Sequence, residues 1–294
     1  MRGAAVRVRP IPAEWRRRPI PSATSPRAPS PADAESCGAS ASPPSSPLAA
    51  LAAPAGHRRE LAVASRPLHA CVHVTLWSPA GVPDGAPLPL VAVHDGPEYD
   101  RKANLTALAA ALVETGRVPA HRVALLHPGA RDEWYSASAL YARALVREVL
   151  PTVGRAVGVA GLPVGLGASL GGLAMLHAHR RHAAAFAGLF LQSASFFMPR
   201  FDHMEKGFPR FGRIVRFVRG VLGDTAFEHP VPATLTCAEN EDNVHNNRRV
   251  AAALRQQGYQ AALHETPGGH DFETWAGALE RHLGELLSTV WRDA

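Results

Sequence analysis

Residues 164–174 read Val-Gly-Leu-Gly-Ala-Ser-Leu-Gly-Gly-Leu-Ala. Within them Gly167, Ser169 and Gly171 fit the pattern G-x-S-x-G, in which a serine occupies a strained turn between a strand and a helix. The glycines are needed because a Cβ at either position would collide with the neighbouring strand or helix. An apolar stretch precedes Ser169 and a helix-like run follows it, as this turn requires. The stretch therefore predicts Ser169 as a nucleophile held above the end of a strand.

A serine at neutral pH needs a base to remove its proton, and His270 is the best-placed candidate. It lies in Gly268-Gly-His-Asp271, a loop that we expect between the last strand and the last helix. Paired glycines allow such a loop to present an imidazole toward Ser169. The alternative is an ordinary surface histidine, one of the 15 in the chain.

The imidazole in turn needs a carboxylate that fixes its tautomer. After a strand predicted at 233–237 the chain reads Ala238-Glu-Asn-Glu-Asp-Asn243, so three acids compete for this role: Glu239, Glu241 and Asp242. The alternative is a solvated acidic loop without chemistry. The chain order of serine, acid and histidine is nevertheless the order of the α/β-hydrolases.

Developing charge on a carbonyl oxygen needs fixed N–H donors, which form an oxyanion hole. One donor is predicted to be the amide of Leu170, directly after the nucleophile. The second should come from the loop His94-Asp-Gly-Pro97, which follows a predicted strand. Because proline has no N–H, Gly96 or Asp95 must donate, and a plain Asp-Gly-Pro turn is the alternative.

Strands and helices alternate along most of the chain. We expect two antiparallel strands at 60–65 and 70–77, then buried strands at 88–93, 123–127, 187–193 and 233–237, with a last strand from 263. Helices are predicted between them, including one over 138–150 that Pro151 ends. This pattern indicates a three-layer α/β fold with a mostly parallel central sheet, in which ligands bind at the carboxyl ends of the strands.

The region 193–223 mixes phenylalanines with arginines, among them Phe196, Phe197, Arg213 and Arg216. One hypothesis is an aromatic and basic wall that recognises a negatively charged part of a substrate. The alternative is an amphipathic helix that packs phenylalanine inward and leaves arginine in water.

Composition bounds the remaining possibilities. Residues 1–56 are rich in Pro, Ser, Ala and Arg, and we interpret them as a disordered extension that contributes most of the net charge of +6. The nearly neutral remainder predicts no nucleic-acid partner, and no apolar run is long enough to span a membrane. The three cysteines lack metal or CxxC spacing, which favours a reducing compartment, the cytoplasm by default.

Several of these stretches together resemble the esterase D and enterochelin-esterase-like family. They are His94–Tyr99, Arg131–Tyr135, Gly167–Gly172, Glu241–Arg248 and Gly268–Trp275, in consistent order over roughly 60–290. The resemblance implies an α/β-hydrolase fold and ester hydrolysis, with Ser169 as nucleophile, Glu241 as acid and His270 as base. We also expect four residues to contact the substrate: Asp95, Arg131, Phe196 and Phe197.

Two departures from the family pattern matter. Ala238 stands where the family usually has glycine, which leaves the register between Glu241 and Asp242 open. The extension 1–56 is too short and proline-rich for the N-terminal domain of ferric-enterobactin esterases. We therefore predict one domain, 57–294, that acts as a serine carboxylesterase on a small-molecule ester without metal or cofactor. An acyltransferase and a non-catalytic binding protein of the same fold are the alternatives. The ester (siderophore, feruloyl, acetyl-sugar or thioester) and the oligomeric state stay open.

Overall fold

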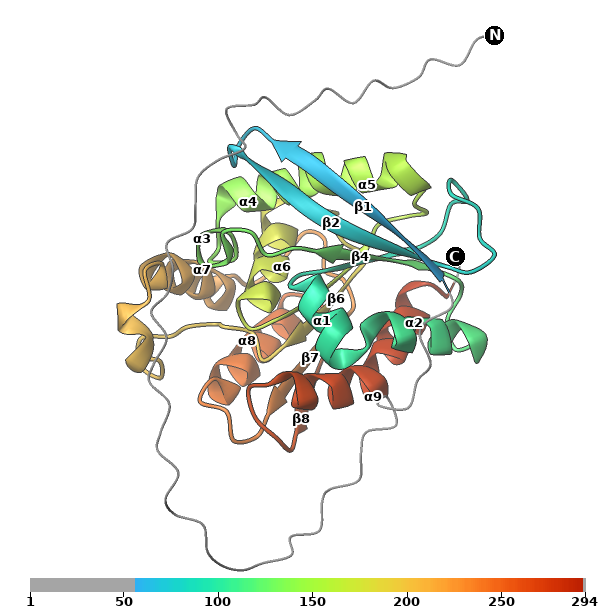
Figure 1. Cartoon of the computed structure of the whole chain (residues 1–294). Coiled ribbons are helices and arrows are strands. Elements are labelled where there is room, and N and C mark those ends of the chain that lie inside the picture. Colours follow the sequence, from blue (N-terminus) through green and yellow to red (C-terminus); the bar gives the residue numbers. More distant parts are fainter. Residues whose placement is uncertain (1–55, 293–294) are drawn as a thin grey trace, which may run out of the picture. The chain divides into compact units, whose positions relative to one another are not determined.

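The computed structural model describes residues 56–292, and within them one sheet has the strand order β1-β2-β4-β3-β5-β6-β7-β8 (Figure 1). β1 and β2 are antiparallel to each other, β2 is antiparallel to β4, and the other neighbouring strands are parallel. The strands are β1 (Gly56–Ser65), β2 (Ala70–Pro79), β3 (Leu90–Val93), β4 (Arg122–Leu126), β5 (Val164–Ala168), β6 (Gly188–Gln192), β7 (Ala233–Ala238) and β8 (Ala261–Thr266). The predicted antiparallel pair and the mostly parallel sheet are confirmed.

Helices cover both faces of the sheet, which makes the predicted three layers. One apolar core contains residues of α4, α5, α6, α7 and α8, and a second core contains residues of α1, α2 and α9. The strands β3 to β7 are buried at every position because each is covered on both sides. The helices are α1 (Gly96–Ala103), α2 (Leu105–Glu114), α3 (Arg131–Trp134), α4 (Ala139–Ala144), α5 (Leu150–Val157), α6 (Leu170–Arg181), α7 (Phe211–Gly223), α8 (Val244–Gln256) and α9 (Phe272–Val290).

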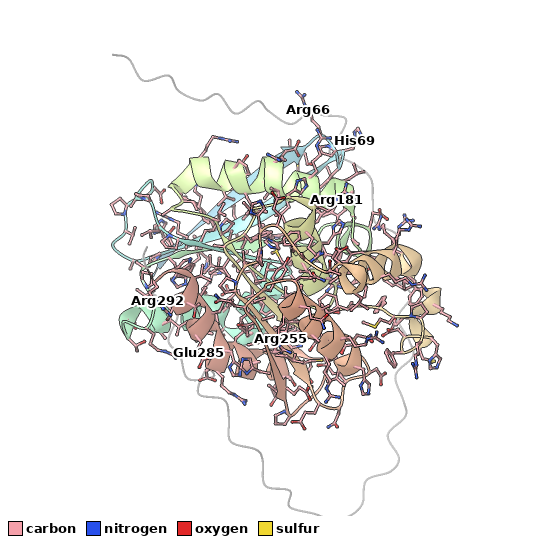
Figure 2. The ribbon with its side chains drawn as sticks, turned by 180° about the vertical axis from the view of Figure 1, so that it is seen from behind. Arg66, His69, Arg181, Arg255, Glu285 and Arg292 are labelled. Carbon is pink, nitrogen blue, oxygen red and sulfur yellow. The ribbon has the colours of Figure 1, made fainter. Side chains whose placement is uncertain are left out.

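The hairpin of β1 and β2 forms one edge of the sheet and turns at Arg66–His69. Figure 2 labels Arg66 and His69 at the periphery of the molecule, and the turn is closed by a hydrogen bond from His69 N–H to the Arg66 carbonyl at 3.2 Å. β5, the strand that precedes Ser169, is the fifth strand from that edge and lies between β3 and β6. The carboxyl end of β5, where Ser169 follows, is therefore flanked by parallel strands on both sides.

The prediction that Pro151 ends a helix is wrong. The helical path runs from α4 through a π-helical turn, Leu145–Val149, into α5, where Pro151 occupies the first turn. The π turn directly before Pro151 interrupts the regular α-helical hydrogen-bond ladder, which gives the proline ring room within a continuous helical path.

The helix α1 was not predicted from the sequence. The predicted oxyanion loop leads directly into α1, which begins at Gly96 with Pro97 in its first turn. Asn104 then adopts a left-handed conformation (φ 47°) and separates α1 from α2. Asparagine tolerates that conformation better than most residues, so α1 ends and α2 begins at Asn104.

The predicted disordered extension falls almost entirely on residues 1–55, which lie outside the described residues; Gly56 begins β1. The assignment of 57–294 to one esterase domain stays a prediction. Within 56–292, no helix combines the length and apolar content that crossing a bilayer would need.

Candidate active site

Ser169 occupies a sharp turn between β5 and α6, as the sequence predicted. Its backbone has φ 53° and ψ −124°, a conformation that side chains other than glycine rarely adopt. The Ser169 N–H donates to the Gln192 carbonyl at the end of β6 (2.9 Å), which anchors the turn to the neighbouring strand. The strain is thus held in place by the sheet itself.

The glycines around Ser169 are required by close backbone approach. A Cβ on Gly167 would lie 2.6 Å from the carbonyl carbon of Gly171, and one on Gly172 would lie 2.9 Å from the carbonyl oxygen of Gly167. Both distances are far below normal contact, so the start of α6 can approach β5 only if these positions lack side chains.

His94 supports the turn from the neighbouring strand β3. Its Nδ1–H donates to the Gly171 carbonyl (2.9 Å), so its Nε2 accepts from the Tyr141 hydroxyl (2.9 Å). His94 is completely buried, and burial lowers its pKa to about 4. The imidazole is therefore neutral near pH 7, with its tautomer fixed by the two partners. His94 therefore stabilises the turn that carries Ser169.

Glu241 and His270 meet although 29 residues separate them. His270 Nδ1 lies 2.7 Å from Glu241 Oε2, and the Glu241 side chain is 4% exposed whereas that of His270 is 44% exposed. Glu241 follows β7, and His270 lies between β8 and α9, at the carboxyl ends of two adjacent strands. This contact distinguishes Glu241 from Glu239 and Asp242, neither of which has a hydrogen bond to His270 in the described structure.

Two further donors hold the Glu241 carboxylate, and the sequence reasoning missed the first of them. Glu241 Oε1 accepts from the Ser193 hydroxyl (2.6 Å) and from Ala238 N–H (3.0 Å). The Ser193 hydroxyl itself accepts from Trp275 Nε1–H at 3.0 Å. Burial acts to raise the pKa of Glu241, but the bonds from His270, Ser193 and Ala238 outweigh it, so that the pKa is lowered. The carboxylate is ionised at neutral pH.

The loop that carries His270 is shaped by its own polar contacts. Gly268 has φ 122°, and a Cβ there would collide with Thr274 at 2.2 Å. Asp271 caps α9 by accepting from Thr274 N–H (2.9 Å). The ring of Trp275 meets the His270 ring edge-on at 5.1 Å between centroids. Glycine is therefore needed at position 268 because Thr274 packs closely against it.

A cavity of about 540 Å³ opens above Ser169 and His270, and both residues line it. In the described structure the Ser169 hydroxyl bonds Ser195 Oγ (3.0 Å) and has no hydrogen bond to His270. Ser195 also lines the cavity, and the sequence reasoning missed it. Its signal was available: Ser193 and Ser195 follow the end of β6, where ligands of such sheets bind.

The predicted oxyanion and substrate residues divide into two groups. Leu170 and Arg131 line the cavity, but Gly96 and Asp95 do not. Asp95 is buried and accepts three hydrogen bonds from Arg131: Nε to Oδ1 at 2.9 Å, Nε to Oδ2 at 3.1 Å, and Nη2 to Oδ2 at 2.8 Å. The expectation that Asp95 contacts substrate is therefore wrong, because its carboxylate is occupied by Arg131.

The phenylalanines and arginines of the region 193–223 also lie in different places. Phe197 lines the cavity, whereas Phe196 has no exposed surface and belongs to the apolar core, so its predicted substrate contact is wrong. Arg213 pairs with Glu133 (2.7 Å), and Arg213 and Arg216 line a different groove together with Arg181, which Figure 2 labels. The arginine part of the predicted anion-binding wall is thus wrong: α7 is amphipathic, with Ile214 and Val218 buried.

The family model Esterase, described as "Putative esterase", matches residues 65–209. Residues 65–209, just under half of the chain, resemble this esterase family. No curated protein sequence matches it significantly. The match covers β2, the His94 loop, the Ser169 turn and the first part of the Phe/Arg region.

Solved structures share the fold of this chain. It is similar to an enterobactin esterase from Shigella flexneri in the presence of 2,3-di-hydroxy-N-benzoyl-glycine (21% identity, TM-score 0.69, 83% of this chain and 63% of that one). It is also similar to a ferulic acid esterase (19%, 0.66, 79% and 98%) and to S-formylglutathione hydrolase FrmB from Staphylococcus aureus (15%, 0.59, 81% and 99%). The likeness shows the α/β-hydrolase fold, and the chain spans less than two thirds of the enterobactin esterase's length.

Proposed function

We propose that the protein is a serine carboxylesterase that works through Ser169, Glu241 and His270. The observation that carries the proposal is the 2.7 Å contact of His270 with a buried Glu241, beside a strained Ser169 in the same cavity. A histidine oriented by a carboxylate, next to a serine in an elbow, is the arrangement that acyl transfer needs. The match of residues 65–209 to an esterase family model supports the same reaction class.

In the first half of the proposed reaction, Ser169 Oγ attacks the ester carbonyl while His270 Nε2 accepts its proton. The hydroxyl must leave its present bond with Ser195 for one with His270, and such catalytic contacts often tighten only when substrate is bound. The tetrahedral oxyanion would be held by the amide of Leu170 and by a second donor from the Gly96 loop. Collapse breaks the ester C–O bond, and His270 returns the proton to the leaving alkoxide.

In the second half, water attacks the acyl-enzyme. His270 takes a proton from the water, and the second tetrahedral intermediate collapses to release the acid and restore the Ser169 hydroxyl. Glu241 stays ionised throughout and stabilises the imidazolium, in agreement with its lowered pKa. The Ser193 hydroxyl and Ala238 N–H keep that carboxylate in place.

The test is hydrolysis of p-nitrophenyl acetate and butyrate by the full chain and by Ser169→Ala, with labelling by a fluorophosphonate probe alongside. We expect Ser169→Ala to lose labelling and at least about 10³-fold in kcat/KM, since the nucleophile is removed. Ser288→Ala, a serine of α9 outside the cavity, is the matched control and should behave as the wild type. Equal hydrolysis by wild type and Ser169→Ala contradicts the proposal, and absence of labelling in both favours a binding protein.

A further inference from the structure

The cavity at Ser169 presents carboxylates from three separate segments of the chain. Besides Glu241, four acids line it: Asp132 of α3, Asp202 and Glu205 of the region after β6, and Asp242 of the loop after β7. None of these four forms an ion pair within residues 56–292. Asp132, Glu205 and Asp242 are exposed.

In the part of the chain that the structure describes, Arg131 is the one arginine or lysine that lines the same cavity, and it is already paired. It donates three hydrogen bonds to Asp95, two from Nε and one from Nη2, so its charge is matched by a carboxylate of the protein. A ligand in the cavity therefore meets four carboxylates that have no ion-pair partner among the described residues, and a cleft of one sign concentrates ligands of the other sign.

Asp202 is the most buried of the four acids, at 7% exposed. Its oxygens accept from Asn246 Nδ2 (2.9 and 2.8 Å) and from Met198 N–H (2.6 Å), which are neutral donors. Burial raises the pKa of Asp202, because its carboxylate has lost water and its hydrogen-bond donors carry no charge. A positive group in the cavity would supply what this carboxylate lacks.

The wall next to these acids is aromatic. Phe197, Phe201 and Phe208 line the cavity, and they are held by further ring contacts: Phe197 stacks on Phe211 (5.7 Å) and meets Phe208 edge-on (6.1 Å). Aromatic faces beside carboxylates attract alkylated ammonium and guanidinium groups. Phe201 already carries Arg200 over its ring at 5.6 Å and stacks with His245 at 5.8 Å, so Phe197 and Phe208 are the rings more open to a ligand.

We propose that the ester hydrolysed at Ser169 carries a positively charged alkylammonium or guanidinium group, which binds between the phenylalanines and the carboxylates of Asp202, Glu205 and Asp242. This inference rests on the proposed function and narrows its substrate class. It also reverses the anionic preference that the Phe/Arg region suggested, because the arginines lie outside the cavity and the phenylalanines lie in it.

The test uses pairs of esters that differ only in charge. On the acyl side, p-nitrophenyl 4-(trimethylammonio)butanoate is compared with p-nitrophenyl 5,5-dimethylhexanoate, its neutral isostere. On the alcohol side, choline butyrate is compared with 3,3-dimethylbutyl butyrate. We expect the cationic member of at least one pair to have the higher kcat/KM, by about 2- to 30-fold at low salt, the range of one cation–π contact. The preference should shrink in 0.5 M NaCl as screening increases. Preference for the neutral member in both pairs overturns the inference.

Variants locate the effect. Glu205→Gln and Asp242→Asn should each reduce the cationic-to-neutral ratio by roughly two- to fivefold, as expected for loss of one exposed charge partner. Glu239→Gln is the matched control, because Glu239 is exposed on the same loop as Asp242 but does not line the cavity. An equal reduction of the ratio in all three variants would show that the overall electrostatic field of the protein, and not a binding site, causes the preference. That result would overturn the inference.

Failure of the proposed function can be separated from failure of this inference. If no ester is hydrolysed faster by wild type than by Ser169→Ala, the esterase proposal fails. The cation site is then measured by calorimetric titration of Ser169→Ala with choline butyrate and with 3,3-dimethylbutyl butyrate. Tighter binding of choline butyrate, weakened by Glu205→Gln, supports the site, and equal or absent binding overturns it.

Discussion

Glu241 Oε2 lies 2.7 Å from His270 Nδ1, and this bond joins an almost fully buried carboxylate to an imidazole that is nearly half exposed. Burial fixes the carboxylate, while exposure leaves the second imidazole nitrogen accessible from the cavity. The asymmetry suits a pair in which one partner orients and the other exchanges protons.

The first prediction concerns the identity of the acid. Glu241→Gln should lower kcat/KM for p-nitrophenyl butyrate by about 10³- to 10⁴-fold, because the imidazole loses the charge that selects its tautomer. Asp242→Asn, next to it in the loop and without a bond to His270, should lower the same value far less. Steady-state kinetics of the two variants decide the matter, and a larger loss for Asp242→Asn would mean that the loop changes register when substrate binds.

Ser193 is predicted to be a positioning residue for Glu241. Ser193→Ala removes a 2.6 Å hydrogen bond to the carboxylate and should lower kcat about 10- to 100-fold, as expected for a hydrogen bond to a charged group. KM should change little, since Ser193 does not line the cavity. Trp275→Phe, which removes only the donor to Ser193, should have the same kind of effect at smaller size. A raised KM with unchanged kcat in either variant would contradict the role.

Acid should destabilise the fold through buried histidines. The pKa values of His94 and His121 are each lowered to about 4 by burial, from an ordinary value near 6.5. Between these limits the unfolded chain binds protons that the folded chain does not, so the free energy of unfolding falls as pH drops from about 6.5 to 4. Each histidine contributes at most about 3 kcal/mol to this loss.

Urea unfolding at pH 7.5 and pH 4.5 measures this pH dependence. His121→Gln should reduce the difference in unfolding free energy between the two pH values, because one of the titrating groups is gone. His94→Gln should reduce it as well, but it should also lower stability at pH 7.5 through the contacts to Gly171 and Tyr141. An unchanged pH difference in both variants would mean that other groups dominate acid unfolding.

The last prediction concerns the backbone of the nucleophile turn. Gly167→Ala places a Cβ 2.6 Å from the Gly171 carbonyl carbon, so α6 must move away from β5. We expect loss of esterase activity with a markedly lower thermal midpoint, or no folded protein. Gly212→Ala is the control: nothing lies within 4 Å of the new Cβ, and alanine in a helix should add up to about 1 kcal/mol of stability. A normal thermal midpoint and activity in Gly167→Ala would contradict the close packing described for this turn.

Local signals were enough to predict much of the fold. Apolar runs between turns predicted β3 to β7 to within a few residues, since strands covered on both faces leave a strong mark in sequence. Helix interruptions were harder to predict. The boundary at Asn104 depends on a left-handed residue, and the passage through Pro151 depends on a π turn, which periodicity does not reveal.

At the site, the strained serine, the glycines that permit it and the loops that hold an acid and a histidine could be predicted from the chain alone. These features depend on neighbouring residues and on strand order, both of which can be followed along the sequence. The folded arrangement was needed to show that Glu241 rather than Asp242 meets His270, that Ser193 supports it, and that phenylalanines of the region 193–223 line the cavity while its arginines do not. These facts depend on the directions of side chains from segments distant in sequence, and those directions are set by packing against the whole core.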